Sequence, residues 1–150
     1  MRKFLIFIAI SLAAVMLVSC SKSDKKERKS HIETTILQAA TAELSSMLRF
    51  IRMSQTTYKV ETGKYMECMP SPPDGGTDAA PDVWVDAGGF GDMGFRPDGL
   101  VRYQYAVTVS EDGKSYKITA TGDLDANGTK VVHTTTDNNP MVTREPPDEY

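Results

Sequence analysis

The stretch that decides the fold is residues 101–136, which read VRYQYAVTVSEDGKSYKITATGDLDANGTKVVHTTT. Apolar and polar side chains alternate from residue 101 to 109, so one face of a strand would carry Val101, Tyr103, Tyr105, Val107 and Val109. The Asp-Gly pair in SEDGKS predicts a hairpin turn, because these residues tolerate positive φ angles. Residues 115–121 then pair back, and GDLDANGT turns the chain into a third strand over residues 129–136. The pattern predicts an antiparallel meander.

A long helix is predicted before this meander. Ser30 and Glu33 fit a capping box, in which each side chain satisfies a backbone amide at the start of a helix. An apolar stripe with three- and four-residue steps follows, made of Ile32, Ile36, Leu37, Ala40, Leu44, Met47, Leu48 and Ile51. Solvated side chains are expected on the other side, at Glu33, Gln38, Glu43, Ser46, Arg49 and Arg52. The helix is predicted to run to about Lys59 and to stop at Gly63.

Residues 66–99 separate the helix from the meander and are rich in Pro, Gly and Asp, which favour turns. We expect a loop region here, held to the core by Val83, Trp84, Val85, Phe90 and Phe95. Together these elements predict an α+β fold in which a long N-terminal helix packs on a three- to four-stranded antiparallel sheet.

The N-terminus carries a secretory signal. Residues 1–3 are Met-Arg-Lys, and a short apolar run follows up to Val18. About 20 apolar residues are needed to span a bilayer, so this run is short for a membrane anchor and typical of a signal peptide. Residues 17–20, Leu-Val-Ser-Cys, resemble the lipobox of bacterial lipoproteins. That resemblance implies cleavage before Cys20, a diacylglycerol on its thiol and a fatty acid such as palmitate on the new N-terminus.

A lipid on Cys20 would hold the protein on a membrane. One acyl chain binds only marginally, whereas two or three bind durably, at about 0.8 kcal/mol per buried methylene. Residues 20–29 then form a basic tether of at most about 35 Å. Ser21 stands where lipoproteins kept at the inner membrane commonly carry Asp. By that resemblance the outer membrane is the expected location.

Charge excludes one class of partner. The chain has 150 residues and a net charge of −3, and from residue 30 onward ten Lys/Arg face eighteen Asp/Glu. Nucleic-acid binding needs a basic face, so no nucleic-acid partner is expected. No Gly-x-Ser-x-Gly, His-Glu-x-x-His or phosphate-binding glycine loop occurs, and we expect no enzymatic activity and no required cofactor.

The segment DLDANG matches the first half of a calcium-loop pattern. Asp123, Asp125 and Asn127 are the candidate ligands of a weak calcium site, but position twelve of the loop is Thr134, which has no carboxylate. An Asx-Gly turn explains the same residues without a metal. Both interpretations stay open.

The order of elements resembles the globular part of type IV pilins and pseudopilins. The resemblance lies in TYKVETGKYMEC, GFRPDGLVRYQYAVTV and YKITATGDLDANGT, and it extends over about residues 34–139. It implies a pilin-like head, and some pilin-like proteins hold calcium near a comparable turn. Relatives commonly close the variable loop with a disulfide, whereas Cys68 has no partner here once Cys20 is lipidated. A buried thiol, an intermolecular disulfide and an exposed thiol remain open for Cys68, and no intramolecular disulfide is expected.

The chain departs from pilins at its start. Pilins are cleaved after a glycine and keep an apolar helix, but no glycine precedes Gly63 here. We therefore predict a signal peptide (1–19), a lipidated tether (20–29), a pilin-like domain (30–139) and a polar flexible tail (140–150). The expected function is a non-enzymatic, lipid-anchored cell-envelope protein that contacts envelope, pilus or secretion proteins. The alternatives are a minor pilin or pseudopilin of a type IV pilus or type II secretion system, and a calcium-binding module.

Overall fold

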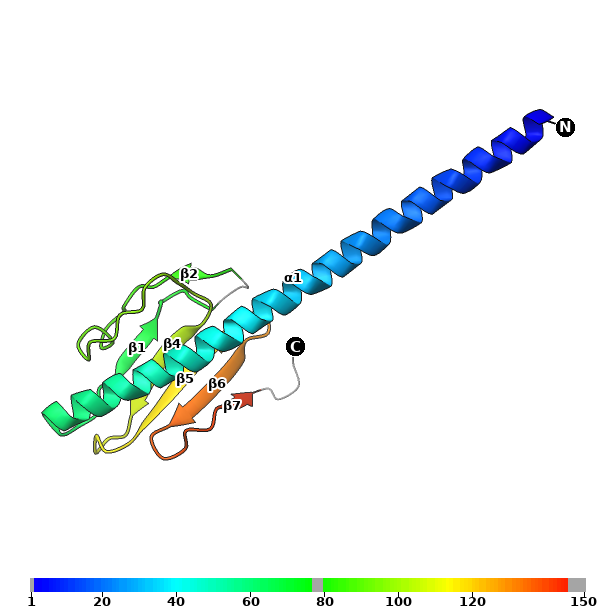
Figure 1. The fold of residues 1–150 in the computed structure, drawn as a ribbon. Helices are drawn as coiled ribbons and strands as arrows, with labels where there is room; N and C mark the ends of the chain where they lie inside the picture. Colours follow the sequence, from blue (N-terminus) through cyan, green and yellow to red (C-terminus); the bar gives the residue numbers. More distant parts are fainter. Residues whose placement is uncertain (1, 77–79, 146–150) are drawn as a thin grey trace. The chain divides into compact units, whose positions relative to one another are not determined.

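A computed structural model describes the backbone of residues 2–76 and 80–145, and the side chains of residues 31–76 and 80–145 (Figure 1). The chain divides into two units, residues 1–39 and 40–150. The first unit contributes the N-terminal part of helix α1, and its described backbone is helical throughout. The second unit contains the rest of α1 and every described strand.

Helix α1 covers Arg2–Thr62, so the predicted helix start at Ser30 is wrong. Residues 20–31 contain neither Pro nor Gly and are rich in Lys, Glu and Arg, which favour helix, so nothing local interrupts it. The predicted stop is confirmed. Gly63 has a φ of 83°, and its N–H donates to the Lys59 carbonyl oxygen at 2.8 Å, as at a helix end closed by glycine.

The predicted fold with a three- to four-stranded sheet is wrong, because the structure has a five-stranded antiparallel sheet and a separate two-stranded one. The larger sheet has the order β1-β4-β5-β6-β7, formed by Cys68–Ser71, Gln104–Val109, Tyr116–Gly122, Val131–Thr136 and Thr143–Glu145. The smaller pairs β2, Asp82–Val83, with β3, Leu100–Val101. Three of these strands lie in segments predicted to be loop or tail.

The core lies between the sheet and the part of α1 within the second unit (Figure 1). The helix buries Ala40, Leu44, Met47, Leu48 and Ile51. The facing strands bury alternate residues, which are Tyr105, Val107, Tyr116, Ile118, Ala120, Val131, His133 and Thr135. The periodicities of helix and strand thus put one face of each element into a common apolar interior.

The segment between β1 and β4 is held by aromatic packing. The Trp84 ring meets Phe90 edge to face at 5.2 Å and Phe95 at 5.6 Å between centroids. Phe90 and Phe95 are buried as predicted, whereas Val83 and Val85 are 67% and 51% exposed and do not anchor the segment. Trp84 itself is half-buried, and its ring packs on these two buried aromatic side chains.

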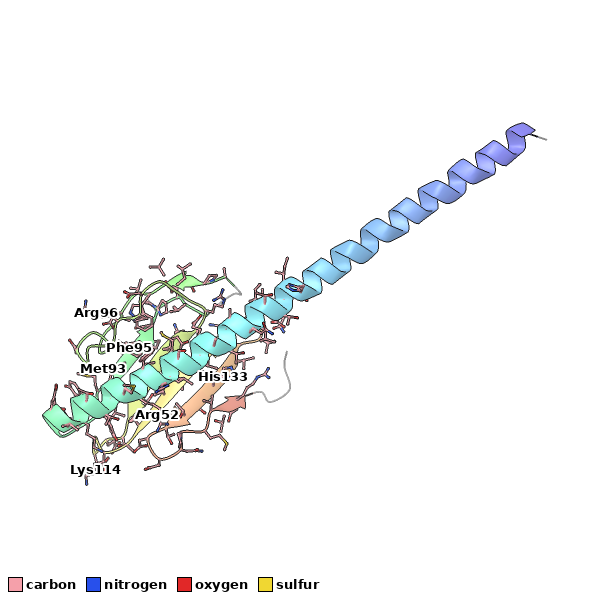
Figure 2. The ribbon with its side chains drawn as sticks, viewed as in Figure 1. Arg52, Met93, Phe95, Arg96, Lys114 and His133 are labelled. Carbon is pink, nitrogen blue, oxygen red and sulfur yellow. The ribbon has the colours of Figure 1, made fainter. Side chains whose placement is uncertain are left out.

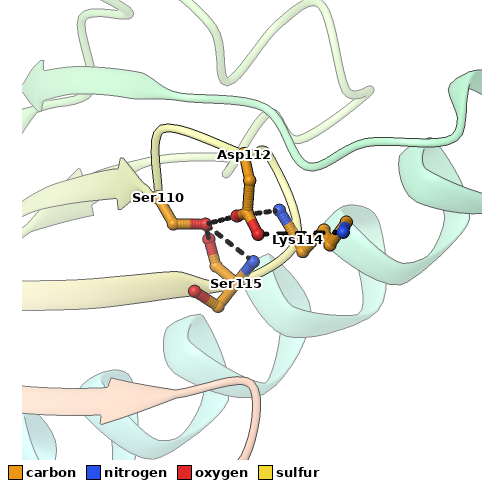
Figure 3. Close-up of polar contacts among 4 residues, drawn as sticks. All are labelled: Ser110, Asp112, Lys114 and Ser115. Carbon is orange, nitrogen blue, oxygen red and sulfur yellow. Dashed lines mark hydrogen bonds and ion pairs between the residues drawn. The ribbon is translucent and has the colours of Figure 1, made fainter.

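The β4–β5 turn differs from the predicted one in its backbone. Only Gly113 has a positive φ, 69°, and its N–H donates to the Ser110 carbonyl oxygen at 2.8 Å. The Ser110 hydroxyl donates to Asp112 at 2.7 Å and accepts the Ser115 N–H at 3.0 Å, while Asp112 also accepts the Lys114 N–H (Figure 3). Side-chain acceptors thus close a turn in which only one residue takes the left-handed conformation.

Candidate functional site

The structure brings the three candidate cation ligands together in the β5–β6 turn. Asp123 is buried and accepts the backbone N–H groups of Asn127 at 3.2 Å and Gly128 at 2.8 Å. Asp125 accepts from the Asn127 side chain at 2.8 Å, and Asn127 accepts the Thr129 N–H at 2.6 Å. The turn has positive φ at Ala126 and Gly128. Each of the three side chains therefore has an oxygen that already accepts a hydrogen bond from the turn itself.

This arrangement explains the turn without an ion. Calcium needs six to eight oxygen ligands, whereas both Asp123 oxygens already accept backbone amides of the turn. Within the described ranges, no group of three or more His, Cys, Asp or Glu side chains is placed to hold a metal ion. The weak calcium site stays a prediction.

We expect Asp123→Ala to lower the free energy of unfolding by about 1–3 kcal/mol, because the Gly128 amide loses its carboxylate acceptor and the Asn127 amide keeps only Asp125. Asp125→Ala is the matched control: its carboxylate is exposed, so the cost should be below about 1 kcal/mol. Urea unfolding measures both. Repeating it with excess calcium tests the cation site, since a stabilisation present in the wild type and lost in Asp123→Ala requires bound metal. Equal costs for the two variants would contradict the role of Asp123.

The predicted lipidation site, Cys20, has its side chain outside the described residues. Its backbone lies in α1. Within residues 31–62, the part of α1 whose side chains are described, no segment is long and apolar enough to span a bilayer. Lipidation of Cys20 thus stays a prediction from the sequence.

Cys68 is a free thiol that is 2% exposed on strand β1. Gln55 Nε2 lies 3.9 Å from its Sγ. Burial, with smaller contributions from Asp86, Asp92 and Glu67, raises the pKa of Cys68 to about 12. The thiol is therefore protonated at neutral pH, and since the thiolate is the reactive form, Cys68 is a poor nucleophile. Of the three states left open by the sequence, the structure shows the buried thiol.

Glu43 was expected to be solvated, and that expectation is wrong. Its carboxylate accepts the Arg102 N–H at 2.8 Å and the Tyr105 hydroxyl at 3.2 Å, and Arg102 Nη1 lies 3.5 Å from its other oxygen. Burial, followed by the charge of Glu43, raises the pKa of Tyr105. The cluster ties α1 to β4 and leaves no unpaired carboxylate for acid–base chemistry.

His133, labelled in Figure 2, is buried in strand β6. Its ring meets Tyr103 edge to face at 5.7 Å between centroids, and Arg144 of β7 lies opposite it in the strand register. Burial and the Arg144 charge lower the pKa of His133. The neutral imidazole is thus the form that the fold favours.

We expect the free energy of unfolding to fall as the pH drops below about 6.5, the value for an unfolded histidine. The folded state holds His133 below that value, so the unfolded state binds the proton first and acid favours unfolding. The slope from one group cannot exceed about 1.4 kcal/mol per pH unit. In His133→Gln this part of the pH dependence should vanish between pH about 6.5 and 5. The midpoints of urea unfolding, measured across that pH range, test this prediction. Identical pH dependence in the wild type and in His133→Gln would contradict the role given to His133.

A basic groove, which the sequence did not predict, lies between α1 and the segment from β6 to β7. Arg49, Arg52 and Met53 line it from the helix, and Thr135, Pro140 and Val142 line it from the other side, around a volume of about 660 Å³. We call it the arginine groove. The sequence placed both arginines on the polar side of the helix but gave no signal that Arg52 meets β6, because that contact joins residues 83 apart.

Comparison of the chain with protein-family models, curated proteins and solved structures gave no match. The described residues therefore define the protein by its own architecture: one helix whose C-terminal part covers a five-stranded antiparallel sheet, with a basic groove beside the helix.

Proposed function

We propose that this protein is a lipid-anchored component of the bacterial cell envelope whose folded head has a non-enzymatic structural or protein-binding role. The proposal rests on one observation: Leu-Val-Ser-Cys at residues 17–20 ends a short apolar run that follows a positively charged start. That run is too short for a typical spanning helix and suits a cleaved signal. Acyl chains on Cys20 would then provide the membrane attachment.

Ser21 after the cysteine favours the outer membrane as the destination, by resemblance to lipoprotein sorting signals. A binding role suits the chemistry of the head. The Cys68 thiol is protonated at neutral pH, and the partly buried carboxylate of Glu43 and the buried one of Asp123 accept hydrogen bonds from their neighbours. Groups used in this way support the fold, whereas acid–base or nucleophilic catalysis needs accessible groups with suitable pKa values.

Metabolic labelling with palmitate tests the proposal, together with the mass of the mature N-terminal peptide. We expect a labelled protein that begins at Cys20, and loss of label and of membrane attachment in Cys20→Ala. Cys68→Ala is the matched control, because it removes the other cysteine and should keep the label. An unlabelled protein that retains residues 1–19 would overturn the proposal.

A minor pilin or pseudopilin is the second candidate. It is favoured by the order of elements noted above and by the unbroken helix from Arg2 to Thr62, which a retained N-terminus would keep. Co-purification with pilus or secretion proteins, with residues 1–19 still present, would support it over the first candidate. Recovery of the acylated, shortened form without those proteins would exclude it.

A further inference from the structure

The arginine groove combines a positioned cation with exposed apolar surface. Arg52 Nη1 donates to the Thr135 hydroxyl at 3.1 Å and to the Thr136 carbonyl oxygen at 3.0 Å. These bonds fix the guanidinium through one of its three nitrogens. Its Nε and Nη2 donors make no hydrogen bond within the described part of the chain. A guanidinium held in this way offers its remaining donors as a pair, which matches the two oxygens of a carboxylate.

Arg49 adds a second cation on the same side of the helix. It is exposed and lies three residues before Arg52, a spacing that places Cβ atoms about 5–6 Å apart on a helix. No Asp or Glu belongs to the described lining of the groove. From residue 30 onward, by contrast, the chain has ten Lys/Arg against eighteen Asp/Glu. The groove is thus a local positive site on an acidic head, and its charge complements a carboxylate ligand.

The apolar part of the groove lining adds a second requirement for the chemistry of the ligand. Met53 is 56% exposed and Val142 is 42% exposed, and Pro140 completes this side. Exposed methionine is a common feature of surfaces that accept varied apolar side chains. The volume of about 660 Å³ suits a few side chains rather than a whole domain. A ligand that satisfies both parts carries carboxylates next to aliphatic groups.

We propose that the arginine groove binds an acidic, aliphatic peptide segment of a partner protein, with Arg52 and Arg49 engaging its carboxylates and Met53 and Val142 its apolar side chains. This inference deepens the proposed function by naming the surface and the chemistry of the partner. An anionic bilayer is a poorer fit, because membrane surfaces are held by clusters of about four to eight Lys/Arg, whereas this groove has two.

The test uses the full chain in zwitterionic nanodiscs and a short fluorescein-labelled peptide of alternating leucine and glutamate, with empty nanodiscs as the baseline. Fluorescence anisotropy should show saturable binding that weakens as salt is added. Arg52→Gln should weaken it about tenfold or more, and Arg52→Lys should also weaken it, because lysine keeps the charge but loses the paired donors. Arg49→Gln should weaken binding several-fold.

Lys114→Gln is the matched control, since it removes the same charge from the exposed β4–β5 turn and should leave binding unchanged. A peptide of alternating leucine and lysine should not bind. Arg49→Gln also guards against misfolding, because its side chain is exposed and its melting temperature should equal that of the wild type.

The proposal is overturned if the leucine–glutamate peptide does not bind, or binds equally to wild type, Arg49→Gln and Arg52→Gln. It is also overturned if the same variants instead abolish binding to phosphatidylglycerol vesicles or self-association in sedimentation. None of these readouts depends on acylation, so a protein that fails the palmitate test can still pass this one, and the reverse also holds.

Discussion

Replacing Gly89 by Ala should lower the free energy of unfolding by about 3–5 kcal/mol, combining a left-handed backbone with overpacking. Gly89 has a φ of 95° in the segment that follows β2. A Cβ there would lie 2.3 Å from the Glu67 carbonyl oxygen and 2.9 Å from the Cys68 Cα. Both are backbone atoms beside strand β1, so no rotation of a side chain can relieve the contact.

Gly94→Ala separates the two causes. Gly94 has a φ of 75°, but a Cβ there would meet nothing within 4 Å, so this variant carries only the backbone cost of about 1–2 kcal/mol. Urea unfolding of both variants, followed by tryptophan fluorescence, gives the difference. A Gly89→Ala protein as stable as Gly94→Ala would show that the approach of residue 89 to β1 is not close in solution.

Local patterns predicted the parts of the fold that are made by neighbours in sequence. The alternation of Tyr105 and Val107 identified the buried face of β4, and Gly63 marked the end of α1. In each case the residues that carry the sequence signal lie within a few positions of the structural feature that they predict. The helix start at Ser30 failed because a capping box is also compatible with a helix interior when no Pro or Gly breaks the preceding segment.

The strands that the sequence did not predict had no comparable local signal. Strand β1 contains Pro70 and has a register irregularity against β4, and β7 has three residues, Thr143–Glu145. Such segments become strands because a neighbouring edge offers hydrogen bonds, which is a tertiary effect. Around β1 the sequence showed Pro and Gly and indicated turns, and where β7 forms it predicted a flexible tail. In neither place did it show that the chain returns to the sheet.

The same division applies to the candidate sites. The Asp123 turn was found from its residues, since turn chemistry is local. The arginine groove was not, because the bond from Arg52 to Thr135 depends on how α1 meets β6. Glu43 shows the reverse error: its place on the polar side of the helix indicated solvent, but Arg102 and Tyr105 reach it from β3–β4.

Gln55→Leu should lower the free energy of unfolding by about 2–5 kcal/mol, because two partly buried backbone groups of Met66 lose their Gln55 partner. Gln55 is fully buried on α1, and its amide bridges both polar groups of Met66. Nε2 donates to the carbonyl oxygen at 2.6 Å, and Oε1 accepts the N–H at 2.9 Å. Leucine has a similar volume, so the loss should come from the unpaired groups at Met66 rather than from a cavity.

Hydrogen exchange makes this prediction specific to the bridge between α1 and the chain that leads into β1. The Met66 amide should be protected in the wild type and should exchange much faster in Gln55→Leu, because its acceptor is gone. Thr56→Val is the matched control on the next residue, whose hydroxyl donates only to Arg52 of its own helix, and its cost should stay below about 0.5 kcal/mol. If Gln55→Leu unfolds at the wild-type midpoint with Met66 still protected, a backbone partner other than Gln55 holds this junction, and the helix would be coupled to β1 through its apolar contacts alone.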